Sequence, residues 1–119
     1  MKRKMLVGML LLCGITISLS AQEMKTEKFK VAGNCDMCKN RIEKAAKSVE
    51  GVTSANWDKD TKMIEVKFYP DSTSLHKIEM AIADAGHDTE MHKASDEVYN
   101  KLPGCCHYER MKDGNSGHN

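Results

Sequence analysis

The sequence predicts an α+β domain in which two helices cover one face of a four-stranded antiparallel sheet. Two observations support this prediction. Short runs alternate apolar with charged residues, as half-buried strands do, and two longer runs repeat apolar residues at helical spacing. At 119 residues the chain has room for one such core, because a single domain usually needs on the order of 100 residues. One small domain with appended segments is therefore expected.

The N-terminal segment is typical of a signal peptide. Basic residues at positions 2–4 precede an uncharged apolar run over 5–19, which is shorter than the roughly 20 apolar residues of a membrane-spanning helix. The small residue Ala21 lies where a cleavage site would. Residues 1–21 are therefore predicted to be removed on export. The mature chain would then lie in the periplasm or another extracytoplasmic part of the envelope, without stable membrane insertion.

The charge pattern argues against a nucleic-acid partner. The chain has 18 Lys and Arg against 17 Asp and Glu side chains, and the two signs are interspersed. No cationic block appears, and only 5% of the residues are aromatic. Neither phosphate binding nor base stacking is indicated. We expect a solvated surface of mixed charge.

The first half of the predicted domain has the order strand, helix, strand, strand. Residues 24–31 alternate charged and apolar side chains and end before Gly33, as a half-buried strand would. An amphipathic helix follows, and Gly51 can terminate it. Strands at 52–57 and 63–69, joined by a polar turn, then predict a hairpin.

The second half begins with another helix. Pro70 ends the preceding strand, and the polar residues 71–74 offer side chains that cap a helix N-terminus. Gly86 can end this helix, and residues 87–92 are expected to form a short last strand. The apolar stripe of the helix is Leu75, Ile78, Ile82 and Ala85.

This order of elements over residues 24–93 is the split βαβ arrangement of ferredoxin-like folds. Residues 94–119 are expected to form a C-terminal tail that contains a Cys-Cys-His cluster. Its end, residues 113–119, contains no apolar residue to bury and is predicted to be flexible.

Cys35 and Cys38 are the predicted metal ligands. They fall where the first strand meets the first helix, and the free N–H groups and positive end of a helix stabilise thiolates, the form that binds metal. The two intervening residues let both sulfurs reach one ion. An open two-sulfur site suits Cu(I), Hg(II) or another soft ion, which could enter and leave by ligand exchange.

Four motifs recur together in one known family. They are Val31-x-Gly33-x-Cys35-x-x-Cys38, Ile42-Glu43-x-Ala45, Gly51-Val52 and Ala81-Ile82-x-x-Ala85-Gly86. In these motifs the chain resembles the heavy-metal-associated domains of copper chaperones, metal-transporting P-type ATPases and periplasmic mercury-binding proteins. The resemblance implies Cys35 and Cys38 as ligands, a soft metal ion as cargo, Cu(I) foremost, and transfer to a metal-transporting membrane protein or another acceptor. The usual Gly-Met-x-Cys-x-x-Cys loop is one residue shorter here and lacks its methionine, which affects loop shape and metal preference.

Other side chains could extend or alter this site. Asp36 could give an oxygen ligand to Zn(II) or Cd(II), or could stabilise the helix start as an exposed carboxylate. His87 is either a third ligand or a solvated loop histidine. Cys105, Cys106 and His107 lie outside the predicted domain. They form either an auxiliary metal or thiol site, or a redox-inert pair, or a bridge to other cysteines.

Two other functions would use the same cysteine motif. A thiol-disulfide oxidoreductase also presents Cys-x-x-Cys at a helix start. However, neither Pro70 nor Pro103 precedes a strand facing the motif, and the expected order of elements differs from a thioredoxin-like domain. A binding module with a structural disulfide between Cys35 and Cys38 is the second alternative. Since no hydrolase constellation is present either, we predict a metal-binding protein and not an enzyme.

Overall fold

The computed structural model describes residues 23–112. The predicted signal peptide, residues 1–21, and the predicted flexible end, residues 113–119, lie outside this range. None of the helices in the described range combines the length and apolar character needed to span a membrane. The elements in chain order are β1 (Lys25–Lys30), α1 (Asp36–Lys47), β2 (Val52–Trp57), β3 (Met63–Phe68), α2 (Leu75–Asp84), α3 (Asp96–Asn100) and the 3-10 turn η1 (Gly104–Cys106).

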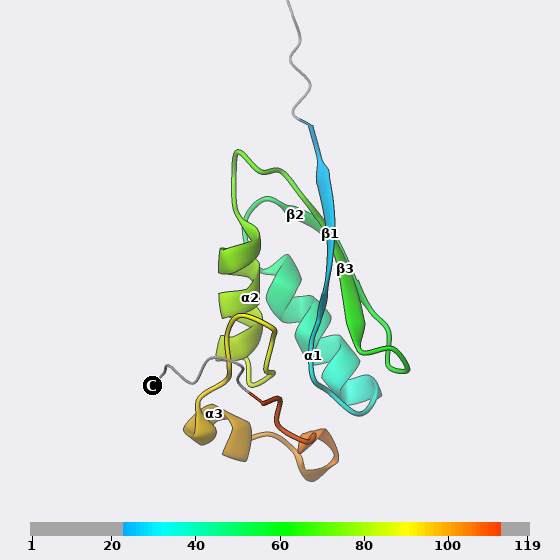
Figure 1. The fold of residues 1–119 in the computed structure, drawn as a ribbon, viewed down its shortest axis with the longest axis vertical. Helices are drawn as coiled ribbons and strands as arrows, with labels where there is room; N and C mark the ends of the chain where they lie inside the picture. Colours follow the sequence, from blue (N-terminus) through cyan, green and yellow to red (C-terminus); the bar gives the residue numbers. More distant parts are fainter. Residues whose placement is uncertain (1–22, 113–119) are drawn as a thin grey trace, which may run out of the picture.

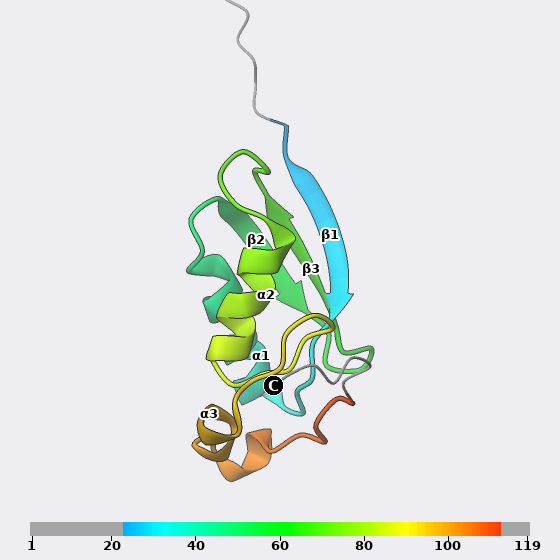
Figure 2. The same ribbon diagram turned by 60° about the vertical axis from the view of Figure 1, so that its left-hand side comes forward.

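The sheet has the order β1-β3-β2, with β3 antiparallel to both neighbours. Ile64 in the central strand lies opposite Phe29 on one side and Trp57 on the other. Helices α1 and α2 both lie on one face of this sheet (Figures 1 and 2). The α+β class and the placement of the two helices therefore agree with the prediction.

The core lies between this face of the sheet and the two helices. Apolar side chains at every second strand position and on one stripe of each helix are buried there, and burial of a large apolar side chain stabilises the fold by about 1.5–3 kcal/mol. Ser74 accepts a hydrogen bond from the Lys77 N–H and so caps α2. The core residues from these elements are Phe29, Trp57, Ile64, Val66, Phe68, Cys38, Ile42, Ala46, Ile78 and Ile82.

The predicted fourth strand is absent from the described residues, so the prediction of a four-stranded sheet was wrong. Residues 87–92 contain no strand, and a single antiparallel bridge joins Thr89 to Val31, just after β1. The reason is a tight local turn. The Thr89 N–H donates to the His92 carbonyl oxygen at 2.7 Å, and the His92 N–H donates to the Thr89 hydroxyl at 2.9 Å. These bonds use backbone groups that a longer ladder would need.

Residues 94–112 are called the C-terminal segment below. They pack against the domain, although the sequence predicted that the domain ends at residue 93. Leu102, Cys106 and Tyr108 are buried in the same core cluster as the sheet and helices. Figure 1 shows α3 below the end of α2 and the following orange turn, η1, near the start of α1, with which η1 is in contact. The segment with the second cysteine pair is therefore part of the folded unit.

Candidate metal centre

The loop between β1 and α1 carries the first cysteine pair, and its Gly33 lies close to both the indole ring of Trp57 and Cys38. Cys35 is the N-cap residue of α1, and Cys38 lies in its first turn and is fully buried. Gly33 allows close packing here, because a Cβ at this position would lie 3.0 Å from the Trp57 ring and 3.1 Å from the Cys38 Cβ. The Asn34 N–H donates to the Cys38 sulfur at 3.3 Å. The loop shape therefore depends on a glycine and on a tryptophan from β2.

Four thiols from two distant segments form one group. The Sγ atom of Cys35 lies 3.5 Å from that of Cys38, 3.3 Å from that of Cys105 and 3.6 Å from that of Cys106. The sulfurs of Cys105 and Cys106 are 4.0 Å apart. All four cysteines are free thiols, so the Cys35–Cys38 disulfide of the second alternative is not formed in this structure. The structure thus brings together the two pairs that the sequence presented as separate sites.

The thiols differ in their ease of ionisation. Burial raises the pKa of Cys35, but the hydrogen bond from the Cys38 N–H and the contacts with the other three thiols outweigh burial and lower this pKa from 9.0 to about 7. Burial raises the pKa of the Cys38 thiol to about 12. Cys35 is therefore the thiol that ionises most readily in the metal-free group, and a metal ion must displace protons from the others.

Two further side chains contact the thiol group, and a third lies next to it in the chain. The Arg41 guanidinium donates to the Cys106 sulfur at 3.3 Å, which places a positive charge beside the thiols. The thioether sulfur of Met37 lies 3.6 Å from the Cys105 sulfur. Asp36 is an exposed carboxylate in the first turn of α1, with an oxygen 3.4 Å from the Lys59 ammonium. Sulfur, and not oxygen, therefore dominates the centre.

The two histidines singled out in the sequence lie outside the thiol group. His87 is fully buried, so it is not a solvated loop residue. Its Nδ1 lies 2.8 Å from the Ala32 carbonyl oxygen, its Nε2 has no hydrogen-bond partner among the described residues, and burial lowers its pKa. His107 is exposed and stacks on Tyr99 with ring centroids 5.0 Å apart. The ligand atoms that all lie within 4.8 Å of one another are the sulfurs of Cys35, Cys105 and Cys106, and neither ring belongs to this set.

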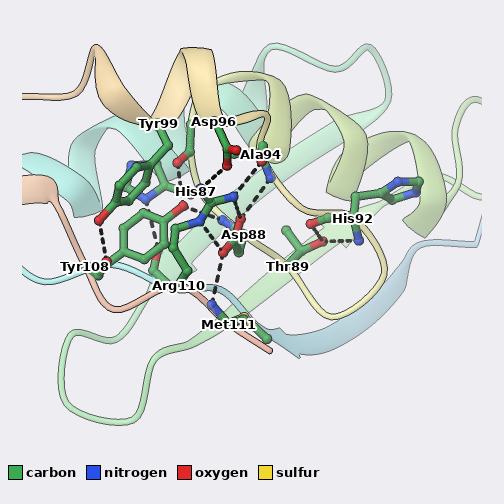
Figure 3. A network of polar contacts seen from close by, with 12 residues as sticks. His87, Asp88, Thr89, His92, Ala94, Asp96, Tyr99, Tyr108, Arg110 and Met111 are labelled. Carbon is green, nitrogen blue, oxygen red and sulfur yellow. Dashed lines mark hydrogen bonds and ion pairs between the residues drawn. The ribbon is translucent and has the colours of Figure 1, made fainter. Parts of the chain in front are cut away.

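A buried ion pair fixes the C-terminal segment to the domain. Figure 3 shows Arg110 reaching the fully buried carboxylate of Asp88. The guanidinium donates to both carboxylate oxygens, at 2.9 and 3.0 Å. The N–H groups of Ala94 and Met111 also donate to this carboxylate, at 2.9 and 3.0 Å. A buried charge with this many partners holds its surroundings in one arrangement.

Tyr108 completes the attachment from the other side. Its hydroxyl donates to the Gly86 carbonyl oxygen at 2.6 Å and accepts from the Asp88 N–H at 3.0 Å. Its ring stacks on His87 with centroids 5.4 Å apart. Tyr108 lies two residues beyond Cys106, so the same attachment positions the second cysteine pair.

Sequence reasoning missed Arg41, Tyr108 and Arg110. Arg41 lies on the helix face that the pattern marks as solvent-exposed, and nothing in the sequence indicates that a distant cysteine covers it. A signal for the other two was present. Tyr108 and Arg110 follow the cysteine pair within four residues, and an aromatic residue there indicates packing, unlike the polar residues 113–119. Spacing alone, however, does not reveal the buried partner, Asp88.

The fold and the thiol group define a small metal-binding domain of ferredoxin-like type. Residues 28–88 match the heavy-metal-associated domain family. Because the match covers about half of the chain and close relatives are matched over most of their length, the chain belongs to the heavy-metal-associated domain family. The match ends before Cys105 and Cys106, so the family resemblance does not include the second pair.

Named relatives and solved structures agree with this assignment. Over 57 residues the chain is 35% identical to the copper chaperone CopZ of Staphylococcus haemolyticus, a match that covers 48% of this chain and 84% of that protein. The crystal structure of oxidised MerP from Ralstonia metallidurans is 32% identical with a TM-score of 0.54, over 56% of this chain and 94% of that one. The Cu(I)-loaded N-terminal domain of a potential copper-translocating P-type ATPase from Bacillus subtilis is 26% identical with a TM-score of 0.54, over 56% and 85% of the two chains.

Proposed function

We propose that this protein captures a soft metal ion, Cu(I) foremost, through Cys35 and Cys38 and transfers it to an acceptor outside the cytoplasm. The observation that supports this most is the position of the pair. Both sulfurs lie 3.5 Å apart at the start of α1, where helix N–H groups favour the thiolate that a metal requires. The protein acts as a carrier and not as an enzyme.

The choice of Cu(I) rests on ligand chemistry and on relatives. A sulfur-rich centre favours soft ions, and the only carboxylate between the two cysteines, Asp36, is exposed and paired with Lys59. Two of the similar proteins are named for copper. Hg(II) is the alternative cargo, as the resemblance to mercury-binding proteins implied and the similarity to MerP supports. Zn(II) or Cd(II) is a further alternative, with Asp36 as the oxygen ligand that the sequence offered or with thiolates alone.

The acceptor and the place of transfer follow from the sequence and from the relatives. The similarity to the soluble domain of a P-type ATPase supports a metal-transporting membrane protein as acceptor, because that domain has the same fold and could present thiols of its own. Residues 1–21 support export to the periplasm. Fractionation of cells that express the full chain should recover it in the periplasmic fraction, shortened at the N-terminus, and recovery in the cytoplasm would contradict export.

The capture step is tested by titration of the reduced chain from Gln22 to Asn119 with Cu(I) in competition with a chelator. We expect about one tightly bound ion per chain, and Cys35→Ser/Cys38→Ser should abolish this binding. Met91→Leu removes an exposed sulfur elsewhere on the surface and is the matched control, which should bind as the wild type does. Undiminished binding by the double variant would overturn the proposal.

The titration is repeated with Hg(II) and Zn(II) to rank the metals. Tighter binding of Zn(II) than of Cu(I) would contradict a soft-metal carrier. Rapid turnover of a small disulfide substrate by the metal-free chain would instead favour the thiol-disulfide oxidoreductase.

A further inference from the structure

The geometry points to a single composite metal site, in which Cys105 and Cys106 bind the same soft ion as Cys35 and Cys38. Three or four thiolates would then surround the ion instead of two. This inference rests on the proposed function and adds that the C-terminal segment controls how readily the ion leaves. It replaces the auxiliary site expected from the sequence, since the second pair lies at the first one.

The sulfur separations favour this arrangement over a two-sulfur complex. With metal–sulfur bonds of about 2.3 Å, two sulfurs lie about 4.6 Å apart in a linear complex, about 4.0 Å in a trigonal one and about 3.8 Å in a tetrahedral one. The sulfurs of Cys35, Cys105 and Cys106 are separated by 3.3, 3.6 and 4.0 Å. A small adjustment therefore gives three-fold coordination.

A linear complex of the first pair alone would demand a larger change. The sulfurs of Cys35 and Cys38 are 3.5 Å apart and would have to separate by roughly 1 Å to reach a linear geometry. Cys38 is fully buried, and its sulfur accepts the Asn34 N–H. The Trp57 ring also packs closely on Gly33, which further restrains this loop.

Charge around the group also suits several thiolates. Cu(I) with three thiolates has a net charge of −2, which is costly at a partly buried place unless a cation lies nearby. The Arg41 guanidinium lies 3.3 Å from the Cys106 sulfur, and Cys106 is fully buried. Each thiol that binds the ion releases its proton to water, and no electron is transferred.

The C-terminal segment is built to keep its cysteines in place. Asp88, Tyr108 and Arg110 attach it through buried and partly buried hydrogen bonds to the chain at 86–88. Cys105 is the exposed member of the group. An acceptor's thiol can therefore replace Cys105 first, so the segment would hold the ion until an acceptor arrives.

X-ray absorption on the reduced chain from Gln22 to Asn119 with one equivalent of Cu(I) counts the sulfur ligands. We expect three or more sulfurs in the wild type and two in Cys105→Ser/Cys106→Ser. The dissociation constant of the variant should rise by roughly ten-fold or more, because loss of even an indirect contact to a metal commonly costs that much. Two sulfurs and equal affinity in both proteins would overturn the inference.

A second measurement needs no change in the C-terminal segment, and so does not depend on how the buried Cys106 tolerates serine. Wild-type protein with one equivalent of Cu(I) is alkylated with iodoacetamide, and each cysteine is followed by peptide mass spectrometry. We expect Cu(I) to protect Cys105 together with Cys35. Protection of Cys35 while Cys105 reacts at its metal-free rate would overturn the inference.

The two proposals fail in different ways. Binding that is undiminished in Cys35→Ser/Cys38→Ser contradicts the proposed function. A wild type that binds Cu(I) through two sulfurs, with Cys105 unprotected, contradicts the composite site alone.

Discussion

The Sγ atom of Cys35 lies 3.3 Å from that of Cys105, although 70 positions separate the two residues in the chain. Cys35 begins α1, and Cys105 lies in η1 of the C-terminal segment. This contact joins the part of the chain that matches the heavy-metal-associated domain family to a part outside that match. It makes the chemistry of Cys35 dependent on how the C-terminal segment is attached.

The first prediction concerns thiol reactivity in the reduced, metal-free protein. Because its pKa is about 7, Cys35 should be alkylated at neutral pH, with a rate that rises through that pH. Cys38, which is buried and has a pKa of about 12, should remain unmodified. Iodoacetamide labelling followed by peptide mass spectrometry between about pH 5 and pH 9 checks this.

Cys105 is the internal control for that labelling. It is exposed, but its hydrogen bond with Cys35 raises its pKa. It should therefore react only at higher pH than Cys35. Identical pH profiles for the two residues would show that the neighbouring thiols do not lower the pKa of Cys35 relative to that of Cys105.

The second prediction concerns acid stability through Asp88. Burial raises the pKa of this carboxyl, but the hydrogen bonds from Arg110, Ala94 and Met111 outweigh burial and hold it below 3.8. A lowered folded-state pKa means that the stabilisation is complete above the unfolded pKa of about 3.9 and is lost as the pH falls through the folded-state value.

Asp88→Asn should therefore be less stable than the wild type at neutral pH, and the gap should shrink below about pH 4. Urea unfolding of both proteins at pH 7 and near pH 3 gives the two free energies of unfolding. A gap that stays constant over this range would contradict the ionised Asp88–Arg110 pair.

The third prediction concerns the junction of α2 with the C-terminal segment. Gly86 has φ +114°, and an added Cβ would lie 2.8 Å from a Leu102 methyl carbon. Gly86→Ala should lower the free energy of unfolding by roughly 1–3 kcal/mol, since non-glycine residues are strained in this region. Thermal or urea unfolding measures the loss.

Gly104→Ala is the matched control for this variant. A Cβ at Gly104 would meet no atom within 4 Å, so the free energy of unfolding should stay near that of the wild type. Equal losses in the two variants would mean that the strain at Gly86 is not the cause.

Much of the fold could be predicted because local patterns specify it. Alternation over 63–69 predicts β3, observed as Met63–Phe68, and the strand at 52–57 is observed as β2. Gly86, which has a positive φ, follows the C-cap residue of α2 as expected. Gly51 also has a positive φ, but α1 ends earlier, at Lys47, and Gly51 lies in the turn before β2. The last strand is not formed because the Thr89 N–H donates to the His92 carbonyl oxygen and the His92 N–H to the Thr89 hydroxyl. The sequence pattern does not reveal this local turn.

The candidate site was predicted in part. The Cys35-x-x-Cys38 spacing places two sulfurs at one helix start whatever the rest of the chain does, because one turn of helix separates them. The position of Cys105 and Cys106 depends on the contacts of Tyr108 and Arg110 with the segment around Asp88. Such contacts join residues about 20 positions apart in irregular structure, where no periodicity relates them.

The sequence by itself determined the α+β domain, the family and the first cysteine pair, since strand and helix periods and short motifs are local properties of the chain. Only the tertiary structure decided that the second pair lies at the first and that His87 is buried. The physical reason is that both depend on one buried ion pair, Asp88 with Arg110, and on Tyr108 packing against the core. These contacts stabilise the fold only when segments distant in the chain come together and remove their surfaces from water. Local sequence patterns do not specify which distant segments do so.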